Sequence, residues 1–522
     1  MNKINNDCCI VIPIYNTTPS YFEDISILNV IDLYHDKYDI VFIHPNKLNI
    51  ESYKKYDLSF IEYTNWNGKI NSYNNMCLSL DFYELFSNYN YILISQTDSL
   101  ILNDYLDDWI SKNYDYIGAP EIYNILNRYD LTFNHYNFNG GFSLRKVKSF
   151  IEAIKYLKKL NISNTFYEDG IYSLLPNNIL SKCPLNTAKY FAISHYISNN
   201  NIPNYYNENF DTSKIFGVHK FDVHNVSFNR YNNPEFFEYI KPKIFNRCFY
   251  IVNKYYKETY TKDCIIIIPV YNKYPKFLEE ISILNTIKLY SNKYDIYIIY
   301  SENLDITYYT KRFYDVNFAK IDNNIWDNTY EGYNKMCLNG DFYGAFLDYK
   351  YMFLVQTDAH IFNSDLNKWL EMNYDYYGGP SLITNDIPVW NNLHNDFLYK
   401  LVEEKKYYNY NGGLCIRNIN KFMHISNLLP LLYYEYDSED IIFSTINAIT
   451  NSNIINYCPY EKVKLFSNDY DVSLSNEEIN NLFGCHNIHR VYTMVDYDKV
   501  IDKYKLFYKK INEKYIIHIS NM

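Results

Sequence analysis

The sequence contains no apolar run that approaches the ~18 residues of a membrane span. It also lacks a basic excess, because 49 Lys and Arg residues stand against 60 Asp and Glu residues and give a formal charge of −11. This acidic balance argues against a nucleic-acid binder, which usually has a basic face. The first residues, Met1-Asn-Lys-Ile-Asn-Asn-Asp7, show no apolar core behind a basic segment, so we expect no signal peptide and a cytoplasmic protein. The Lys- and Tyr-rich segments 249–262 and 499–517 leave contact with the cytoplasmic face of a membrane as an alternative.

Zinc-type Cys-x-x-Cys spacing is missing from the ten cysteines as well. Three cysteines recur at matched places in the two halves of the chain: Cys9 with Cys264, Cys77 with Cys337, and Cys183 with Cys458. Single cysteines beside apolar residues are typical of small buried core thiols. In a reducing compartment we expect no disulfide framework.

The chain contains one long sequence unit written twice. Ile25-Ser-Ile-Leu-Asn29 equals Ile281-Ser-Ile-Leu-Asn285, an offset of 256 residues, and the offset between Cys183 and Cys458 is 275 residues. Such a period is too long for a solenoid, whose repeats run ~20–50 residues, and indicates a duplicated domain. We expect a first domain at 1–245, a linking helix at 246–262, a second domain at 263–490 and a C-terminal helical tail at 491–522.

Within a copy, short apolar runs alternate with segments in which apolar residues recur at helical spacing. The pattern predicts buried strands at 8–14, 39–44 and 91–95, and helical segments at 20–35, 70–88 and from Arg145 to about Leu160. The Asn139-Gly-Gly segment is expected to interrupt regular structure. Alternation of strands and helices is typical of an α/β protein with a mostly parallel sheet, here present twice.

Polar residues follow two of the predicted strands. Pro13-Ile-Tyr-Asn16 returns as Pro269-Val-Tyr-Asn272, and Gln96-Thr-Asp98 returns as Gln356-Thr-Asp358. Open α/β sheets bind ligands at the carboxyl ends of their strands. The first loop could therefore cradle a nucleotide, or it could be a plain turn after a buried strand. The Asp could hold a divalent cation that bridges phosphates, or it could cap the following turn.

A third motif, Asn139-Gly-Gly-Phe-Ser-Leu-Arg145, returns as Asn411-Gly-Gly-Leu-Cys-Ile-Arg417. Glycine permits positive φ and a close approach of the backbone to a ligand. The Arg could pair with a phosphate or with a carboxylate of the site. The alternative is a tight turn that leaves the Arg on the solvated face of the next helix.

Two further motifs lie downstream in each copy. Glu168-Asp169 returns as Glu439-Asp440, and a carboxylate there could act as a general base on an acceptor hydroxyl or could cap a helix. Phe216-Gly-Val-His219 returns as Phe483-Gly-Cys-His486. Its imidazole could complete a metal site begun by the Asp, or it could be structural.

In this order the motifs resemble those of predicted glycosyltransferases of the GT-A fold. The closest resemblance is to a bacterial and viral family described only as a domain of unknown function, whose most specific marks are Gln-x-Asp and Asn-Gly-Gly-Phe-Ser-Leu-Arg. Pro-x-Tyr-Asn is also similar to family 2 glycosyltransferases. The resemblance covers nearly all of both copies, apart from the joining and terminal helices. It implies two tandem GT-A-like domains that transfer sugars from nucleotide sugars to a glycan, lipid-linked or protein acceptor, without a nucleic-acid partner.

The resemblance also implies roles for single residues. Asp98 and Asp358 fall where the fold has its Asp-x-Asp motif, which binds Mn²⁺ or Mg²⁺, but Gln96 and Gln356 replace the first carboxylate. The other protein ligands would then be His219 and His486. The donor would lie against Pro13, Tyr15, Asn16, Gln96 and Arg145 in the first copy, and against Pro269, Tyr271, Asn272, Gln356 and Arg417 in the second. Asp169 and Asp440, beside Glu168 and Glu439, match the base of inverting enzymes.

Two intact copies predict a bifunctional enzyme, and small differences between them would allow distinct donors or acceptors. Ser143 and Lys146 in the first copy stand against Cys415 and Asn418 in the second. Three alternatives stay open. One copy could be a sugar- or acceptor-binding module, the whole chain could be a non-catalytic nucleotide-binding or structural protein, or the mechanism could be retaining.

Overall fold

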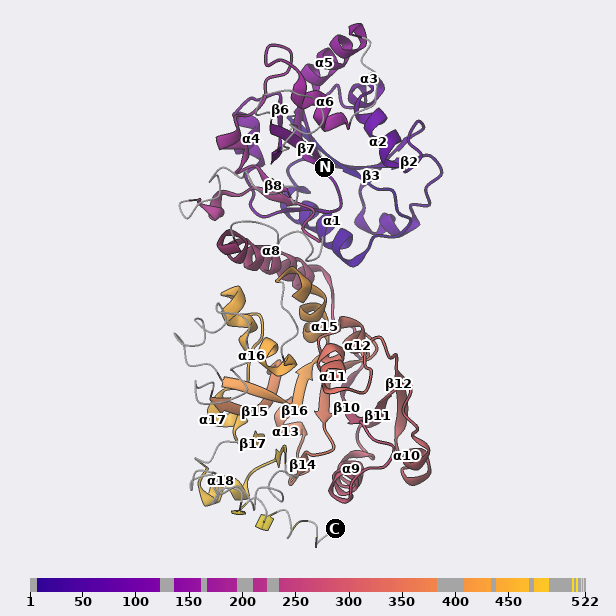
Figure 1. The fold of residues 1–522 in the computed structure, drawn as a ribbon, viewed down its shortest axis with the longest axis vertical. Helices are drawn as coiled ribbons and strands as arrows, with labels where there is room; N and C mark the ends of the chain where they lie inside the picture. Colours follow the sequence, from indigo (N-terminus) through magenta and orange to yellow (C-terminus); the bar gives the residue numbers. More distant parts are fainter. Residues whose placement is uncertain are drawn as a thin grey trace. The chain divides into compact units, whose positions relative to one another are not determined.

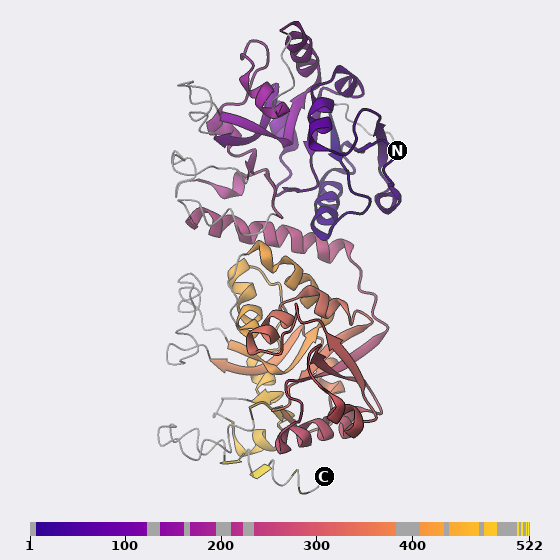
Figure 2. The same cartoon turned by 45° about the vertical axis from the view of Figure 1, so that its right-hand side comes forward.

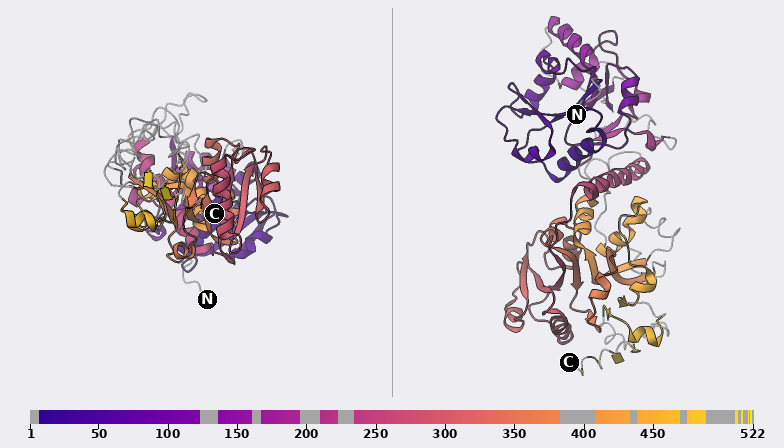
Figure 3. Two further views of the ribbon diagram at one scale, coloured as in Figure 1. Left: turned by 90° about the horizontal axis from the view of Figure 1, so that it is seen from below. Right: turned by 180° about the vertical axis from the view of Figure 1, so that it is seen from behind.

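The computed structural model describes residues 7–122, 136–160, 167–194, 210–222, 234–382, 408–432, 438–468, 474–487, and single positions between 509 and 520. The chain divides into two compact units. Unit 1 comprises Met1–Tyr256 and Pro430–Tyr433, and unit 2 comprises Lys257–Leu429 and Tyr434–Met522. Each unit is a twisted sheet covered by helices (Figure 1), and the other views show the same layers within each unit (Figures 2 and 3).

Unit 1 is built from short strands and helices that alternate along the chain. Its elements are β1 (Cys8–Pro13), α1 (Tyr21–Tyr34), β2 (Asp39–Pro45), β3 (Ser59–Tyr63), α2 (Ile70–Cys77), α3 (Leu80–Glu84), β4 (Tyr91–Ser95), β5 (Ser99–Ile101), α4 (Leu106–Ser111), β6 (Tyr116–Ile122), β7 (Tyr136–Lys146), α5 (Val147–Lys159), α6 (Glu168–Leu174), α7 (Leu185–Ala188), β8 (Ala192–Ser194), β9 (Gly217–His219) and α8 (Pro234–Tyr255).

The main sheet of unit 1 has the strand order β3-β2-β1-β4-β7-β6. The first four of these strands run parallel, whereas β7 runs antiparallel to both β4 and β6. Every residue of β1 and β4 is buried, as expected for central strands that helices cover on both faces. The carboxyl ends of β1 and β4 therefore meet at one edge of the sheet, where the polar motifs follow them.

Unit 2 repeats this architecture. Its elements are β10 (Lys262–Val270), α9 (Phe277–Tyr290), β11 (Asp295–Ser301), α10 (Thr307–Arg312), β12 (Asn317–Ile321), α11 (Tyr330–Cys337), α12 (Gly340–Gly344), β13 (Tyr349–Val355), β14 (His360–Ile361), α13 (Asn367–Leu370), β15 (Tyr376–Leu382), β16 (Tyr408–Asn418), α15 (Ile419–Leu428), α16 (Glu439–Thr450), α17 (Tyr460–Val463), β17 (Ser467–Asn468), α18 (Asn476–Asn480) and β18 (Gly484–Cys485). Its sheet order is β12-β11-β10-β13-β16-β15, the same as in unit 1. The predicted fold class, α/β with two tandem domains built on mostly parallel sheets, is confirmed.

A second, three-stranded sheet in each unit positions the histidine of the Phe-Gly-x-His motif, which ends β9 in unit 1 and directly follows β18 in unit 2. In unit 1 its order is β5-β9-β8, and in unit 2 it is β14-β18-β17. The register pairs His219 at the end of β9 with Ser99 at the start of β5. This pairing brings a histidine from far along the chain next to the Gln-Thr-Asp segment that precedes β5.

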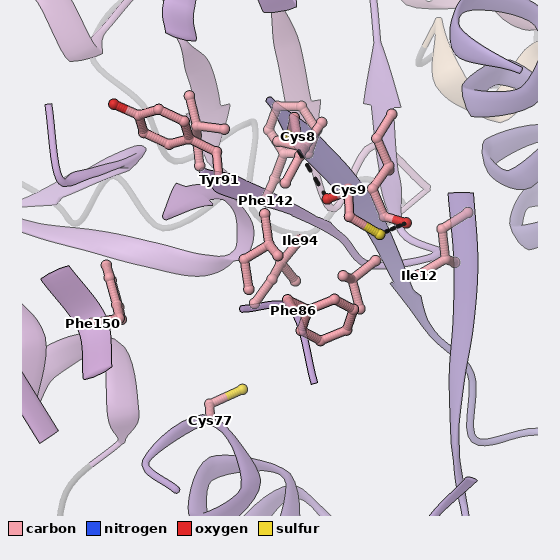
Figure 4. Close-up of a cluster of buried hydrophobic side chains, with 14 of the residues drawn as sticks. Cys8, Cys9, Ile12, Cys77, Phe86, Tyr91, Ile94, Phe142 and Phe150 are labelled. Carbon is pink, nitrogen blue, oxygen red and sulfur yellow. Dashed lines mark hydrogen bonds between the residues drawn. The ribbon is translucent and has the colours of Figure 1, made fainter. Parts of the chain in front are cut away.

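The core of unit 1 lies between the central strands and the helices that pack on them. Cys8, Ile12, Phe86 and Phe142 are among its fully buried side chains, and Figure 4 shows part of this cluster. All ten cysteines are buried and free, which confirms the prediction of core thiols without disulfides.

Most predicted elements match the structure to within one or two residues. α1 begins where Ser20 and Glu23 form a capping box. The helical stretch predicted at 70–88 is divided, because Ser79 caps a new helix and accepts a bond from Phe82 N. As predicted, Asn139-Gly-Gly interrupts the regular pattern, but it does not end the strand. The segment lies inside the 11-residue strand β7, and the irregularity is a register shift in its pairing with β6.

The helix predicted near the end of the first copy is α8, which packs on α1 within unit 1. Arg247 Nη2 and Lys254 Nζ both lie 2.6 Å from the Asp32 carboxylate of α1. The predicted tail at 491–522 and the segment 499–517 lie almost entirely outside the described residues. Among the helices that the structure describes, none combines the length and the apolar character needed to cross a membrane.

A candidate active site in each unit

The Gln-Thr-Asp segment is fixed at the carboxyl end of β4. Gln96 N donates to Gly141 O at 2.8 Å, which extends the antiparallel pairing with β7 by one step. Thr97 Oγ1 donates to Glu23 Oε1 of α1 at 3.1 Å. These two bonds hold the segment between the sheet and the first helix, so Asp98 has a defined position at the edge of the sheet.

Gln96, Asp98 and His219 form a Gln-Asp-His cluster in unit 1. His219 Nε2 lies 3.3 Å from Gln96 Oε1 and 3.3 Å from Asp98 Oδ1. Burial opposes ionisation of Asp98, but the nearby His219 outweighs it and lowers the pKa of the carboxyl below its usual value. The structure therefore brings together the two residues that the sequence proposed as metal ligands, although 121 positions separate them.

Unit 2 contains the same cluster, formed by Gln356, Asp358 and His486. His486 Nε2 lies 3.0 Å from Gln356 Oε1 and 3.2 Å from Asp358 Oδ1. The two clusters come from the two copies of the repeated sequence unit, and their distances agree within 0.3 Å.

The donor set of this cluster fits one hard divalent cation. Neighbouring ligands of an octahedral Mg²⁺ or Mn²⁺ lie about 3 Å apart, because each metal–oxygen bond is about 2.1 Å long. Among the described residues no group of three or more His, Cys, Asp and Glu side chains could hold a metal alone. A cation here would take an amide oxygen, a carboxylate and an imidazole, and would complete its shell with phosphate oxygens and water, as Mg²⁺ commonly does.

The two glycines of each Asn-Gly-Gly motif make room for two different groups. A Cβ on Gly141 would lie 2.3 Å from Gln96 Oε1 and 2.4 Å from His219 Nε2. A Cβ on Gly140 would lie 2.1 Å from Glu168 Oε1. None of the four glycines in the two motifs has a positive φ. They are required for close approach and not for backbone conformation.

The arginine of the same motif forms a buried ion pair. Arg145 is fully buried, and its Nη2 donates to Glu168 Oε1 at 2.9 Å. The guanidinium also donates to the Tyr83 hydroxyl and to Ser143 Oγ, each at 2.9 Å. Of the two partners that the sequence allowed, a phosphate and a carboxylate of the site, the guanidinium therefore meets the carboxylate.

In unit 2 the matching pair is Arg417 and Glu439, 2.6 Å apart. Arg417 Nη1 donates to the Tyr343 hydroxyl at 2.8 Å, but its Nε has no partner, because Cys415 stands where unit 1 has Ser143. The pKa of Glu439 is raised to about 7. Burial is the main cause; Arg417 lowers the pKa and Asp440 raises it.

The Glu-Asp motifs lie in the first turns of α6 and α16. Glu168 and Glu439 are each 3% exposed and are held by their arginines. Asp169 and Asp440 are partly exposed, and their Oδ1 atoms accept the backbone N–H of Gly170 and Ile441 at 2.7 and 2.9 Å. The aspartates are thus the more exposed carboxylates of this motif, and neither is the N-cap of its helix, since Tyr167 and Ser438 occupy those positions.

The loop after the first strand differs between the units. In unit 1, Tyr15 is 50% exposed, and partial burial together with the Asp98 carboxylate raises the pKa of its hydroxyl. In unit 2, Tyr271 packs its ring at 5.4 Å from Trp326 and 5.9 Å from Tyr333. Burial, with smaller contributions from Cys337 and Asp358, raises the pKa of the Tyr271 hydroxyl.

The remaining residues of this loop have structural partners. Asn16 Nδ2 donates to Glu23 Oε1 at 3.2 Å, and the Asn272 carbonyl accepts the Tyr309 hydroxyl at 2.9 Å. Pro13 and Pro269 lie in the central strands, at the positions where pairing with the strand on the Gln-Thr-Asp side has ended. These residues shape the edge of the sheet from which the tyrosines project.

Sequence reasoning assigned no role to the tyrosines that bind the two arginines. Asp81-Phe-Tyr83 returns unchanged as Asp341-Phe-Tyr343, so the repeat itself marks these positions. Asn334 was missed in the same way. Its Oδ1 accepts Glu439 N at 3.1 Å, and its counterpart Asn74 is also an asparagine.

Several solved structures of glycosyltransferases are similar to this chain at low sequence identity. Core-mannan synthase A from Aspergillus fumigatus, in an Mn/GDP form, is 13% identical over 37% of this chain and 71% of its own, with a TM-score of 0.28. A glycosyltransferase of Streptococcus pneumoniae is 12% identical over 60% of this chain and 80% of its own, with a TM-score of 0.26. A mannosyltransferase from Pyrobaculum calidifontis, in complex with GDP-Man and Mn²⁺, is 12% identical over 48% of this chain and 65% of its own, with a TM-score of 0.24. We draw no argument from overlaps this low.

The comparison of sequences gives a sharper result. No curated protein matches the chain significantly. The family described as Protein of unknown function (DUF5672) matches residues 56–215 and again residues 315–486. The two matches include the Gln-Asp-His cluster of unit 2 and, apart from His219, that of unit 1, and together they span well over half of the chain. The chain belongs to this family and contains two tandem copies of its domain.

Proposed function

We propose that the chain is a nucleotide-sugar-dependent glycosyltransferase with one active site in each unit. The observation that carries this proposal is the recurrence of one arrangement in both copies. A Gln-Asp-His cluster at the carboxyl edge of the sheet lies in the same unit as a partly exposed aspartate in the first turn of a helix. The cluster fits a diphosphate-bound cation, and the aspartate fits a general base.

The donor would lie across the carboxyl ends of the first strand and the Gln-Thr-Asp strand. Tyr15 and Tyr271 would border its nucleotide, because each lies in the loop that follows the carboxyl end of the first strand. Mn²⁺ or Mg²⁺, held by Gln96, Asp98 and His219 or by their counterparts in unit 2, would neutralise the charge of the diphosphate leaving group.

The reaction that suits this arrangement is a single displacement with inversion. Asp169 or Asp440 accepts the proton of an acceptor hydroxyl. The hydroxyl oxygen forms a bond to the anomeric carbon of the donor sugar as the bond from that carbon to the diphosphate oxygen breaks. Glu168 and Glu439 do not take part in the proton transfer. Paired with Arg145 and Arg417, they hold the first turns of α6 and α16, and thereby the neighbouring aspartates, in position.

The second candidate is a chain with one catalytic unit and one binding unit. The specific observation in its favour is the first-strand loop, since Tyr271 is packed against Trp326 whereas Tyr15 is half exposed. In this version the donor would enter unit 1, and unit 2 would hold a sugar or an acceptor.

Release of nucleoside diphosphate from UDP-glucose, UDP-galactose, UDP-N-acetylglucosamine and GDP-mannose, with and without Mn²⁺, tests the proposal on the full chain. Asp169→Asn and Asp440→Asn keep size and remove the base, and we expect each to lower transfer in its own unit by about 10²- to 10⁴-fold. Asp108→Asn, an exposed carboxylate on α4, is the control. An effect of only one variant would favour a single catalytic unit. A folded protein that releases no diphosphate from any donor would contradict the proposal.

A further inference from the structure

The exposed residues that flank the Glu-Asp turn differ between the two units in a compensating way. Two positions flank this turn: the first residue of the helix after the third strand, and the residue before the Glu. In unit 1 they are Ile70 and Tyr167, and in unit 2 they are Tyr330 and Ser438. Each unit thus has one tyrosine at these two positions. In unit 1 the tyrosine precedes α6, and in unit 2 it is the first residue of α11.

In unit 2 the tyrosine is held beside the proposed base by several bonds. The Tyr330 hydroxyl lies 3.2 Å from Ser438 Oγ, immediately before Glu439. Asn334 strengthens this connection, because its Nδ2 donates to Tyr330 O at 3.2 Å while its Oδ1 accepts Glu439 N at 3.1 Å. Despite these bonds, Tyr330 remains 67% exposed. The hydroxyl is used internally, and a fixed aromatic ring faces solvent.

In unit 1 the tyrosine sits directly on the other helix. Tyr167 precedes α6, and its carbonyl accepts the Ile171 N–H at 3.2 Å, so its backbone is part of the first helical turn. Its side chain is 67% exposed, and Ile70, at the start of α2, is 58% exposed. Tyr167 therefore lies two positions before Asp169 in the sequence. In unit 2 the matching position, two before Asp440, is Ser438, to which Tyr330 is hydrogen-bonded.

We infer that Tyr167 and Tyr330 are acceptor-binding residues that stack on the pyranose ring of a saccharide acceptor, and that they hold it from different sides in the two units. An exposed tyrosine ring offers a rigid apolar face, and a pyranose ring presents a face of C–H groups with hydroxyls at its edge. A platform this close to the base would position a sugar hydroxyl for deprotonation. The inference rests on the proposed function and narrows its acceptor to a glycan in both units. The swap of elements predicts that the two units prefer different acceptor sugars.

The test measures saccharide binding to the full chain in the presence of Mn²⁺ and either UDP or GDP. Methyl glycosides of glucose, galactose, mannose and N-acetylglucosamine are titrated and followed by saturation-transfer NMR. Tyr330→Ile gives unit 2 the residue that unit 1 has at the matching position, so the glycoside binding that remains unaltered is that of unit 1. Tyr167→Ser does the converse. Loss of one stacked ring should weaken binding to the altered unit about fivefold or more. Tyr330→Phe and Tyr167→Phe keep the ring and should keep most of the affinity.

Tyr314→Ser is the matched control. Tyr314 is 82% exposed, but it precedes β12, which is the edge strand at the other side of the sheet from β16 and β15. Different glycoside preferences in the Tyr330→Ile and Tyr167→Ser chains support the inference, and so does a shift of preference when Ile70→Tyr is added to Tyr167→Ser. Glycoside binding that is equal in all variants, or that the phenylalanine variants lose as fully as the others, overturns it. A wild type that binds UDP or GDP with Mn²⁺ but no glycoside overturns the inference alone. A wild type that binds neither nucleotide overturns the proposed function as well.

Discussion

The two units keep the same buried chemistry and differ in what surrounds it. Both have a Gln-Asp-His cluster and a buried Arg–Glu pair with a tyrosine hydroxyl on the guanidinium. They differ at the third partner of the arginine, where Ser143 stands against Cys415, and in the packing of Tyr15 and Tyr271.

Under the proposed function, this difference would separate residues that the reaction requires from residues that select the substrate. A single carbon added at Gly140, Gly141, Gly412 or Gly413 would collide with the side chains packed around it, so these would have to move. Exposed positions such as Ile70 and Tyr330 have no such constraint. The buried groups are thus the part that the two units share, and the exposed positions are where the two units differ.

Removal of the buried arginine should have the largest effect on either unit. Arg145→Met and Arg417→Met each leave a glutamate buried without its counter-charge. Each should therefore lower the unfolding free energy of its own unit by about 3–5 kcal/mol. We expect the larger loss in unit 1, because Arg145 has the additional Ser143 bond. Amide hydrogen exchange in urea, resolved by peptide, measures each unit separately. Lys155→Met, which removes an exposed pair with Glu152, is the control. A loss no greater than that of the control would contradict the account.

Alanine at the second glycine should separate the metal site from the fold. Gly141→Ala and Gly413→Ala push a carbon against the ring of His219 or His486, and these side chains can yield without unfolding the sheet. We expect Mn²⁺ affinity of the altered unit to fall at least tenfold, about 1.4 kcal/mol, with the melting temperature little changed. Electron paramagnetic resonance of free Mn²⁺ measures the affinity. Gly344→Ala, whose new carbon would meet Met423 Sδ at 3.7 Å, should change neither quantity.

Exchange of the third arginine partner should shift the stability of the two units in opposite directions. Cys415→Ser offers a hydroxyl to the unpaired Arg417 Nε, and Ser143→Cys removes the one that Arg145 uses. A buried bond to a charged group contributes about 1 kcal/mol or more, so unit 2 should gain and unit 1 should lose about this much. Denaturation midpoints of the single and double variants give the values. A change of the same sign in both units would disprove the explanation.

The smallest expected effect concerns the loop that contains Gly68 in unit 1 and Asn328 in unit 2. Gly68 and Asn328 occupy matching positions with φ values of 81° and 67°, and Asn328 Nδ2 donates to Tyr271 O at 2.7 Å. Asparagine tolerates positive φ, so Gly68→Asn should stabilise unit 1 by about 0.5 kcal/mol through reduced freedom of the unfolded chain and a new bond to the Tyr15 carbonyl. Thermal unfolding measures the shift. Destabilisation would show that the two loops are not equivalent.

The sequence predicted the central strands and the first helix well, because their signals are local. β1 and β4 are continuous apolar runs, and α1 carries its own capping box. The long strand β7 was missed at Asn139-Gly-Gly, since glycine is depleted in strands and no local signal marks a close approach. The three-residue strands β5, β8 and β9 are too short to show any periodicity.

The site was predicted in part for the same reason. Repetition of Gln-Thr-Asp and Phe-Gly-x-His in both copies pointed to Asp98 and His219 before any distance was known. The partner of Arg145 could not be predicted, because a phosphate and the Glu168 carboxylate satisfy a guanidinium equally well. Only the packing of α6 on β7 places Glu168 there and leaves Asp169 as the more exposed carboxylate of the motif.

The stoichiometry of Mn²⁺ binding in the presence of a nucleoside diphosphate tests the central claim most directly. Isothermal titration of the full chain would compare the wild type with Asp98→Asn, Asp358→Asn and the double variant. If each unit is a glycosyltransferase domain with its own metal site, the wild type binds two ions, each single variant binds one, and the double variant binds none. A single ion in the wild type that only one of the two substitutions removes would contradict the equivalence of the units. The absence of any Mn²⁺ binding would contradict the assignment of the Gln-Asp-His cluster itself.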